Sequence, residues 1–245
     1  MVSGKYSALS GAVAREQAMG NVASNLANAN TTGFKKDRIS FAAILRGTNQ
    51  TDDAQGVNYA RIRKIGTDFS QGGMQPTGRQ LDVAIDGEGF FKVQKNNEIF
   101  YTRAGHMMLD ENGMVKTQDG ANVLGASNDP LQFDTTAGQD IAIADNGTIS
   151  INGKVVDGKI QVFTVADQSK LQKTGNALYK LENGTADQPS ETYRVLQGNL
   201  ETSNVSMMDE MTAMIANQRA FEAHSKVLES YSTLTNKQDE LGSIA

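Results

Sequence analysis

The chain has helical periodicity at both ends and strand periodicity in its long middle, and this division limits the fold more than any other feature. Near the C-terminus an apolar residue recurs every seven positions, at Met207, Met214, Phe221 and Leu228, with Thr235 continuing the register. Neither Gly nor Pro occurs between residues 198 and 242, so nothing there breaks a helix. A seven-residue apolar repeat predicts a long helix that buries a seam against another helix.

The apolar repeat is wider than this single row. Further apolar positions broaden or extend it: Met208, Met211, Ile215, Val227, Leu234 and Leu241. The N-terminal end has a shorter stripe at three- and four-residue spacing: Leu9, Ala12, Val13, Met19, Val22, Ala23 and Leu26. We expect this second helix to begin near Ser3 or Gly4 and to end within residues 25–34. Gly33 is the expected left-handed residue at its end. The partner of each seam is then the opposite end of the chain, a neighbouring subunit, or both.

The two ends carry opposite charge. Residues 1–46 contain six basic and two acidic residues, a net charge of +4, whereas residues 200–245 contain three basic and seven acidic residues, a net charge of -4. Opposite charges favour pairing one end with the other and disfavour pairing either end with itself. As solvated faces the same charges would contribute only about 0–1 kcal/mol per pair.

The middle of the chain predicts an antiparallel β domain. Apolar residues alternate in residues 81–86, and short apolar runs follow at 90–93, 99–101 and 160–165. Between them stand dipeptides that favour tight two-residue turns: Asp86-Gly87, Asn112-Gly113, Asp119-Gly120, Asn146-Gly147, Asn152-Gly153, Asp157-Gly158 and Asn183-Gly184. The expected fold class is therefore α+β and discontinuous. Terminal helices pair as a coiled-coil-like stem around a central antiparallel β-rich domain.

This pattern divides the chain into four segments. Residues 1–46 hold the N-terminal helix and the segment after it, residues 47–75 form a polar connector, residues 76–195 form the β domain, and residues 196–245 hold the C-terminal helix. A chain of 245 residues with 6% aromatic content and no Trp predicts a lean core. The absence of Cys excludes disulfides and thiolate chemistry, and a net charge of -5 argues against nucleic acid as a partner. The N-terminus lacks the apolar core of a signal peptide, and no apolar run of about 20 residues predicts membrane insertion.

Residues suited to catalysis, metal binding or cofactor binding are scarce. His106 and His224 belong to different predicted elements, and a helix-surface role fits His224 better than a ligand role. Asp82, Asp86 and Glu88 cluster around Gly87, where a turn explains them better than paired acid–base chemistry. Residues 87–90 lack the third Gly of a dinucleotide loop, and residues 110–113 lack the twelfth-position Glu of a calcium loop. The Met residues near 207–214 suit helix packing better than a promiscuous groove. We expect no catalytic site, no metal and no cofactor.

Five sequence blocks resemble one family. Residues 24–35 read SNLANANTTGFK, which is similar to the N-terminal signature of bacterial flagellar rod and hook proteins, except that the family commonly has an Asn pair where this chain has Ser24-Asn25. The other blocks follow in the family's order: GRQLDVAIDGEGFF at 78–91, YTRAG at 101–105, QGNLETSNV at 197–205 and MIANQRAFE at 214–222. Length and the opening residues 6–12 look most like the proximal-rod members, with the distal-rod members next and hook proteins further away.

The resemblance implies a structural subunit of the flagellar basal-body rod, without enzymatic activity. It implies that the paired terminal helices form the inner tube of an axial filament, and that the β domain lies outside them. Implied partners are copies of the chain itself, other axial rod and hook proteins and the flagellar type III export apparatus, which would pass the unfolded chain without cleavage into the cell envelope. Nucleic acid and direct membrane insertion are not expected. The residues expected to carry assembly are Leu9, Val22, Leu26, Asn28, Thr32, Gly33, Phe34, Met207, Met211, Met214, Ile215, Phe221 and Leu228.

Two other classes compete with an assembling subunit. One is a monomeric β-domain binding module whose terminal helices close on each other. The other is an enzyme such as a wall hydrolase, which needs an acid–base pair that the sequence does not display.

Overall fold

A computed structural model describes residues 2–46, 57–133, 140–175, 177–182, 184–190 and 192–242. Its elements are α1 (Val2–Ala27), β1 (Asp37–Arg46), β2 (Val57–Thr67), β3 (Met74–Pro76), β4 (Val83–Gly87), β5 (Phe90–Lys95), β6 (Glu98–Thr102), β7 (Met107–Leu109), β8 (Val115–Thr117), β9 (Asn122–Val123), β10 (Ile141–Ile143), β11 (Thr148–Ile151), β12 (Lys154–Lys159), β13 (Val162–Val165), the 3₁₀ turn η1 (Gln168–Lys170), β14 (Leu171–Gly175), β15 (Leu178–Leu181), β16 (Asp187–Pro189), β17 (Tyr193–Gln197), β18 (Asn199–Glu201) and α2 (Met207–Gly242). The expected α+β class, with helices at both ends and an antiparallel β-rich middle, is confirmed.

The chain divides into two compact units. The helical unit comprises Met1–Ala27, Asp37–Gly66 and Ser206–Ala245, and the β unit comprises Asn28–Lys36 and Thr67–Val205. This division differs from the segments expected from composition, because residues 28–36 and 196–205 belong with the strands. Among the described residues, neither helix is long and apolar enough to cross a membrane.

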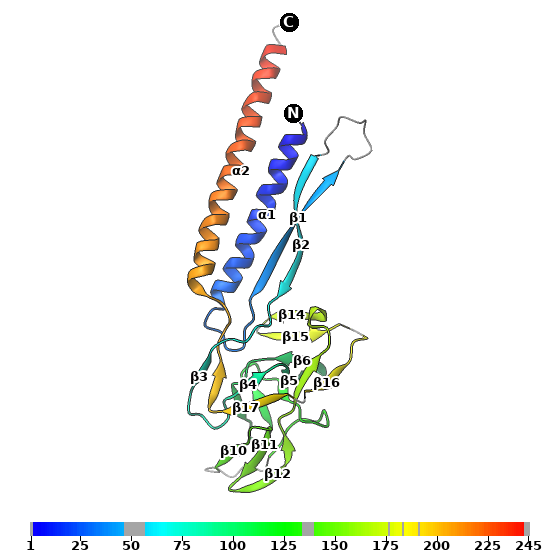
Figure 1. The fold of residues 1–245 in the computed structure, drawn as a ribbon, viewed down its shortest axis with the longest axis vertical. Coiled ribbons are helices and arrows are strands. Elements are labelled where there is room, and N and C mark those ends of the chain that lie inside the picture. Colours follow the sequence, from blue (N-terminus) through cyan, green and yellow to red (C-terminus); the bar gives the residue numbers. More distant parts are fainter. Residues whose placement is uncertain are drawn as a thin grey trace. The chain divides into compact units, whose positions relative to one another are not determined.

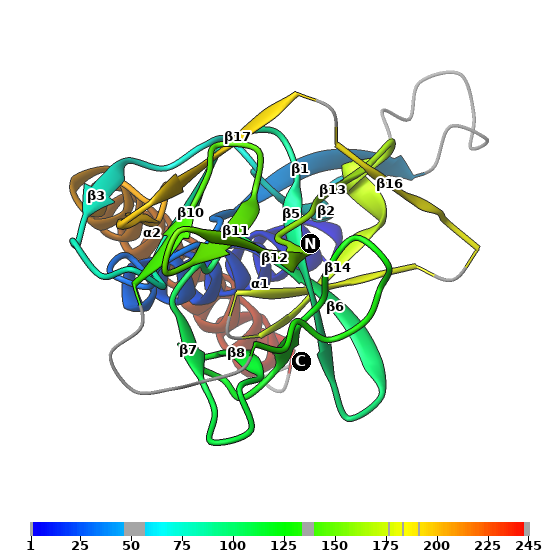
Figure 2. The ribbon, with the colours of Figure 1, turned by 90° about the horizontal axis from the view of Figure 1, so that it is seen from below.

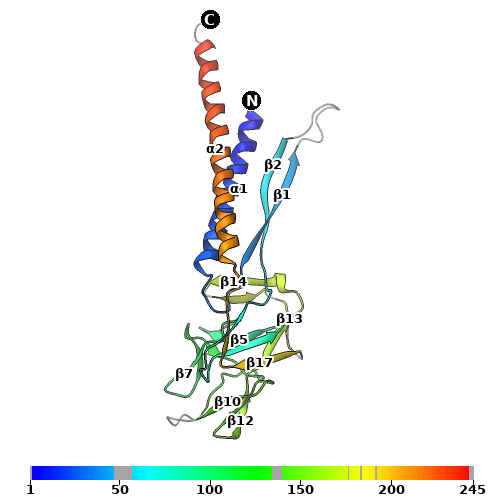
Figure 3. The ribbon, with the colours of Figure 1, turned by 60° about the vertical axis from the view of Figure 1, so that its left-hand side comes forward.

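In the helical unit, α1 and α2 lie side by side, and the β1–β2 hairpin lies along α1 (Figures 1 and 3). Strand β2 lies within residues 47–75, where a polar connector was expected. The prediction missed this strand because β2 carries several charged residues and has no regular alternation of apolar residues. The guanidinium of Arg15 on α1 stacks over the ring of Phe41, 5.0 Å from its centroid, and ties the hairpin to the helix. The connector residues 47–56 lie outside the described residues.

The β unit is built around a nine-stranded sheet that runs β14-β15-β6-β5-β9-β8-β7, with β13 and β16 joined to it through β5. All strand pairs whose register is described are antiparallel, and β10, β11 and β12 form a small separate sheet (Figure 2). Phe90 and Phe91 point to opposite faces of β5, and each face packs into its own apolar cluster. The apolar run 90–93 is therefore a strand with both faces covered, as its lack of alternation indicates.

The turn predictions hold at some dipeptides and fail at two, one of which is Asp86-Gly87, because it ends strand β4 and pairs with β17. Asn152 and Gly153 both have positive φ, 51° and 78°, and form the tight turn between β11 and β12. Asp157-Gly158 lies within β12 instead of forming a turn. Gly158 packs closely there, since a Cβ would lie 3.1 Å from the ring of Phe133. Sequence analysis also missed the β5–β6 turn, which is made by two Asn residues with positive φ, Asn96 and Asn97.

Candidate assembly site

The contact between α1 and α2 is antiparallel. Three contacts show this, because the residue contacted on α2 comes earlier in the chain as the residue on α1 comes later. A Cβ on Gly4 would lie 2.5 Å from the hydroxyl of Tyr231, and a Cβ on Gly11 would lie 2.5 Å from the ring of His224. Nearer the other end, the amide of Asn25 donates to the carboxylate of Glu210 at 3.3 Å. The two glycines therefore allow the helices to approach closely, and they mark the side of α1 that faces α2.

The α1 seam consists mostly of small residues, and only part of the apolar stripe expected from the sequence belongs to it. Ala8, Ala12 and Ala18 are buried, as is Val22, while Leu26 is half-buried. Leu9 is exposed and so does not contribute to the seam within the chain. Its neighbour on that face, Val13, is exposed as well.

The predicted α2 residues separate into two groups. Met214, Phe221 and Leu228 are half-buried and share the side of the helix that carries His224. Met207, Met211 and Ile215 are exposed. Among the α2 side chains that the structure describes, residues 207–238, none is fully buried. The helix thus retains apolar surface that its own chain does not cover.

Asn25 fixes the end of α1 to the start of β1. Its side-chain oxygen accepts a hydrogen bond from the backbone N–H of Asp37 at 3.0 Å, and its amide nitrogen donates to the Asp37 carbonyl, also at 3.0 Å. The side chain is buried and also reaches Glu210 on α2. One amide therefore connects three elements of the helical unit.

The four predicted loop residues belong to the β unit. The hydroxyl of Thr31 donates to the side-chain oxygen of Asn28 at 3.2 Å, within the turn that follows α1, and Thr32 is half-buried beside it. Phe34 is buried under the ammonium group of Lys173, which lies 3.7 Å from the ring centroid.

Gly33 has positive φ, 68°, as expected, but α1 ends six residues earlier at Ala27. The expectation that Gly33 caps the helix is therefore wrong. The positive φ lets the backbone at Gly33 lie close to two other backbone segments. Its N–H donates to the Glu201 carbonyl at 2.8 Å, and a Cβ would lie 2.2 Å from the backbone nitrogen of Ala104.

The β unit contains a buried ionic cluster that the sequence patterns did not indicate, which we call the clasp: Lys35, Ser70, Arg103 and Glu201. The ammonium of Lys35 lies 2.5 Å from one carboxylate oxygen of Glu201, and the guanidinium of Arg103 lies 3.0 Å from the other. Lys35 also donates to the Ser70 carbonyl at 2.7 Å. The three charged side chains are buried, and each occurs within or beside a block that resembles the family. The clasp could have been suspected from the sequence, because each of its charged residues stands in a block of apolar and small residues.

The clasp joins four distant segments of the β unit, at residues 33–36, 70–72, 103 and 201–204. The Glu201 carboxylate also accepts from the backbone N–H of Gly72 at 2.9 Å, and the Asn204 side chain accepts from Lys36 N at 2.8 Å. Burial lowers the pKa of Lys35 below its ordinary value, and the neighbouring Glu201 carboxylate partly opposes that shift. Two cations around one carboxylate make removal of Glu201 costly, since both cations would then be buried without their anion.

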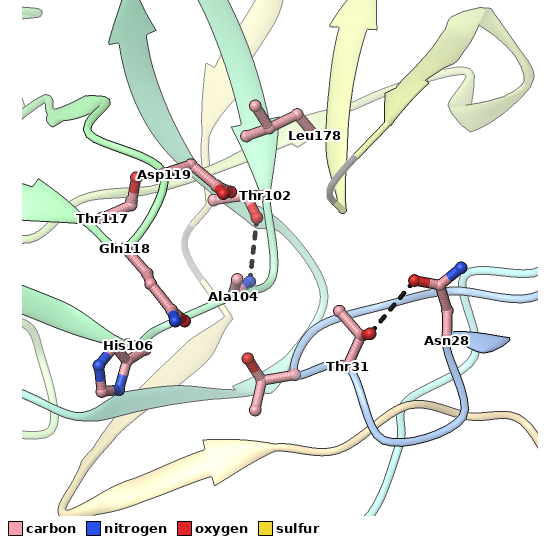
Figure 4. Close-up of a pocket in the computed structure, with 10 residues that line it drawn as sticks. Asn28, Thr31, Thr102, Ala104, His106, Thr117, Gln118, Asp119 and Leu178 are labelled. Carbon is pink, nitrogen blue, oxygen red and sulfur yellow. Dashed lines mark hydrogen bonds between the residues drawn. The ribbon is translucent and has the colours of Figure 1, made fainter.

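The β unit also has a cavity of about 250 Å³ lined mostly by hydroxyl and amide side chains. In Figure 4, Asn28 and Thr31 come from the turn after α1, whereas Gln118 and Asp119 face them from the turn after β8. His106 stands at its edge, with Nδ1 3.0 Å from Asp82 Oδ1 but without the alignment of a hydrogen bond. Arg79 lies 3.3 Å from the other ring nitrogen.

The acidic cluster around Gly87 does not gather into an acid–base pair. Asp82 faces His106, whereas Asp86 forms an ion pair with Arg194 at 2.6 Å. His224 lies on α2 against Gly11, in the helical unit. Within the described ranges, no group of three or more His, Asp or Glu side chains is arranged to hold a metal ion.

Three family profiles match the sequence in order along the chain. The profile described as flagella basal body rod protein matches residues 6–35, the flagellar hook protein FlgE/F/G D1 domain matches residues 84–151, and the flagellar basal body rod FlgEFG protein C-terminal region matches residues 196–240. The first includes most of α1 and Lys35 of the clasp, the middle one includes Arg103, and the last includes most of α2 and Glu201.

Curated proteins match over nearly the whole chain. The flagellar basal-body rod protein FlgG of Bacillus subtilis is 36% identical over 250 residues, covering 93% of this chain and 94% of that protein. The flagellar basal-body rod protein FlgF of Caulobacter vibrioides is 36% identical over 225 residues, covering 91% of each. FlgG of Borreliella burgdorferi is 32% identical and covers 94% of each chain.

Proposed function

This chain belongs to the flagellar basal-body rod protein family and is a structural subunit of the rod, and we propose that it assembles helically through α1 and α2. Membership of the rod and hook family implies assembly with other axial flagellar proteins. Copies of this chain are the further partners we propose. In this account the filament-core contacts come from the parts of residues 1–46 and 196–245 that lie in the helical unit, and residues 76–195 supply the β domain.

One observation carries the assembly proposal: the helix pair covers too little of its own apolar surface. No described α2 side chain is fully buried, although the helix is 36 residues long. A helix with an apolar face must bury that face against a partner to be stable in water. The seven-residue repeat of α2 supports a coiled-coil-like stem, and a neighbouring subunit supplies the burial that the stem lacks.

The small apolar area that α1 and α2 bury against each other also suits export before folding. We propose that the flagellar type III export apparatus passes the chain unfolded and without cleavage, and that α1 and α2 become fully ordered on docking. The α1 seam is lean in apolar area because its residues are mostly Ala and Gly, and the chain has no Cys to form a disulfide during passage. Burial on a neighbour then offsets the entropy lost when the helices become ordered.

The position along the rod is a further proposal. The opening residues favour a proximal-rod subunit, and the 36% identity to a protein named FlgF supports this. The equal identity to a protein named FlgG keeps a distal-rod position as the alternative. A hook subunit is the third possibility within the family.

We also propose that the chain has no catalytic role. The carboxylates near Gly87 are occupied by separate partners, Asp82 with His106 and Asp86 with Arg194, and a general acid–base pair needs two groups directed at one substrate. A wall-cleaving activity of the pure protein that disappears with His106→Gln would replace this proposal.

Two experiments test the proposed function. Labelling this subunit in isolated basal bodies should place it in the rod, and a label on any other part of the flagellum would contradict the proposal. Circular dichroism of the isolated chain should show helix well short of the 26 and 36 residues of α1 and α2. Full helix content in dilute monomer would instead support a closed binding module.

A further inference from the structure

Helix α1 has an apolar face that its own chain leaves uncovered. Tyr6, Leu9 and Val13 are 56%, 46% and 42% exposed. Gly11 marks the side of α1 that contacts α2. At about 100° of rotation per residue, the three side chains lie roughly 140–160° around the helix from Gly11. We call these three residues the outer face of α1.

Helix α2 has a matching face. Met208, Met211 and Ile215 are 74%, 47% and 52% exposed. His224 marks the side of α2 that contacts α1, and the three apolar side chains lie roughly 140–180° around the helix from it. These residues form the outer face of α2. Both outer faces point away from the packing that holds the two helices together.

We propose that the outer face of α1 binds the outer face of α2 from a second copy of this chain. The contact rests on the helical assembly proposed above and specifies which residues form it. Each face repeats with one three-residue and one four-residue step. Copies with the same axial orientation keep α1 and α2 antiparallel, as they are within one chain, so Val13 lies opposite Met208, Leu9 opposite Met211, and Tyr6 opposite Ile215, each to within one residue.

The α2 face that binds the outer face of α1 belongs to another copy, because the α2 of the same chain cannot supply this contact. Gly4 faces Tyr231 and Gly11 faces His224, so Leu9 lies level with the part of α2 near residue 226. Met211 of the same chain is then about 15 residues away along the helix axis, roughly 22 Å at 1.5 Å per residue. Only a copy displaced along the axis by about that distance brings Met211 to Leu9.

Charge also favours this pairing of unlike helices. Helix α1 carries Lys5 and Arg15 against Glu16, a net charge of +1, whereas α2 carries three basic and six acidic residues, a net charge of -3. Contacts between two α2 segments therefore bring like charges together. A contact between α1 and the next copy's α2 brings opposite charges together, and its axial displacement produces an open helical array instead of a closed pair.

Disulfide cross-linking tests the contact, because the chain has no Cys of its own. Cells should express two forms of the full chain together, one with Leu9→Cys and one with Met211→Cys, and rods should be isolated after mild oxidation. We expect a mixed dimer to dominate. The matched control combines Leu9→Cys with Val227→Cys, which is 45% exposed but lies on another side of α2, and should give no dimer above background.

The register has its own test. Val13→Cys should cross-link to Met208→Cys and not to Ile215→Cys, whereas the reverse result would show a parallel contact and overturn the proposal. Dominant cross-links between two Leu9→Cys chains or two Met211→Cys chains would overturn it too. So would rods that contain both forms without the mixed dimer. Absence of the unmodified chain from isolated rods would refute the proposed function itself, and this contact with it.

If the cysteine forms do not enter rods, charge reversal gives a second measurement. Leu9→Glu alone should abolish incorporation, and adding Met211→Lys in the same chain should restore at least one-tenth of it, because each copy then offers both charges to its neighbours. The matched control adds Val227→Lys to Leu9→Glu. Equal recovery with either lysine would contradict the assigned face.

Discussion

At the residue scale, Gly33 occupies a position that only glycine can fill. Its φ of 68° is disfavoured for residues with a Cβ, and a Cβ would lie 2.2 Å from the backbone of Ala104. Gly33→Val should destabilise the β unit by about 2 kcal/mol or more. The half-buried neighbour Thr32 provides the control, because Thr32→Val keeps the shape of the side chain. Urea unfolding followed by tyrosine fluorescence measures both, and equal midpoints would contradict the account of Gly33.

The clasp makes a second prediction at this scale. Glu201→Gln removes the only carboxylate that contacts both Lys35 and Arg103 among the described residues, so two buried cations lose their counter-charge. We expect a loss of about 3–5 kcal/mol in the free energy of unfolding.

An exposed ion pair supplies the control for the clasp. Glu98 and Lys180 lie 2.8 Å apart, and both are about half exposed. Glu98→Gln should change the free energy of unfolding by about 0.5 kcal/mol or less. A similarly small effect of Glu201→Gln would show that the clasp does not stabilise the β unit.

At the scale of elements, two glycines of α1 should respond in opposite ways to the same substitution. A Cβ on Gly20 meets nothing within 4 Å, so Gly20→Ala should stabilise α1 by about 1 kcal/mol through helix propensity alone. A Cβ on Gly11 would press on His224 at 2.5 Å, and Gly11→Ala should lower incorporation into the rod, where α1 and α2 are fully ordered. Circular dichroism of the isolated chain measures the helix gained with Gly20→Ala, and quantification in isolated basal bodies measures the loss with Gly11→Ala. The double change Gly11→Ala, His224→Ala should recover the loss, and no recovery would argue against the antiparallel seam.

The α2 seam makes a second prediction for an element. Phe221 and Leu228 are half-buried on the side of α2 that contacts α1, whereas Glu229 is exposed. Phe221→Asp or Leu228→Asp should block incorporation, because a desolvated carboxylate costs about 2 kcal/mol or more. Glu229→Ala should leave motility close to normal. Swarming assays compare the three variants, and equal motility for all of them would contradict the seam assignment.

The sequence was sufficient to predict elements where periodicity was strong. The heptad positions of α2, the strands near Phe91 and Tyr101, and the turn at Asn152 all follow from apolar spacing and turn chemistry. Periodicity gave no signal for β2, because most side chains of a two-stranded hairpin need not be apolar. Nor did it show which face of α1 meets α2, since small residues form that seam and the larger Leu9 and Val13 face outward.

The clasp could not be predicted from sequence patterns, for a different reason. Lys35, Arg103 and Glu201 are separated by tens of residues, and only the folded chain brings them within hydrogen-bonding distance. Local patterns cannot predict a contact that depends on three distant segments. The same limit applies to Asn25, whose bond to Glu210 spans the length of the chain.

At the scale of the whole molecule, the boundary between the two units determines which truncations the β unit should tolerate. Removing residues 1–27 or 206–245 leaves every clasp residue in place, and we expect the β unit to unfold cooperatively with little change in midpoint. Removing residues 1–36 also deletes Lys35 and the Gly33 contact, and should lower that midpoint strongly. Urea titration of the three chains compares them. Equal stability of the 1–27 and 1–36 deletions would contradict the assignment of residues 28–36 to the β unit.

Incorporation into the rod tests the central claim, that the terminal helices hold this subunit in the axial structure. Cells should express the full chain and the chain lacking residues 206–245 at equal levels, with distinct tags, and both should be quantified in isolated basal bodies. The account predicts that the full chain is recovered in the rod and that the truncated chain is absent, although its β unit is folded. Recovery of both chains in equal amounts from normal rods would contradict it.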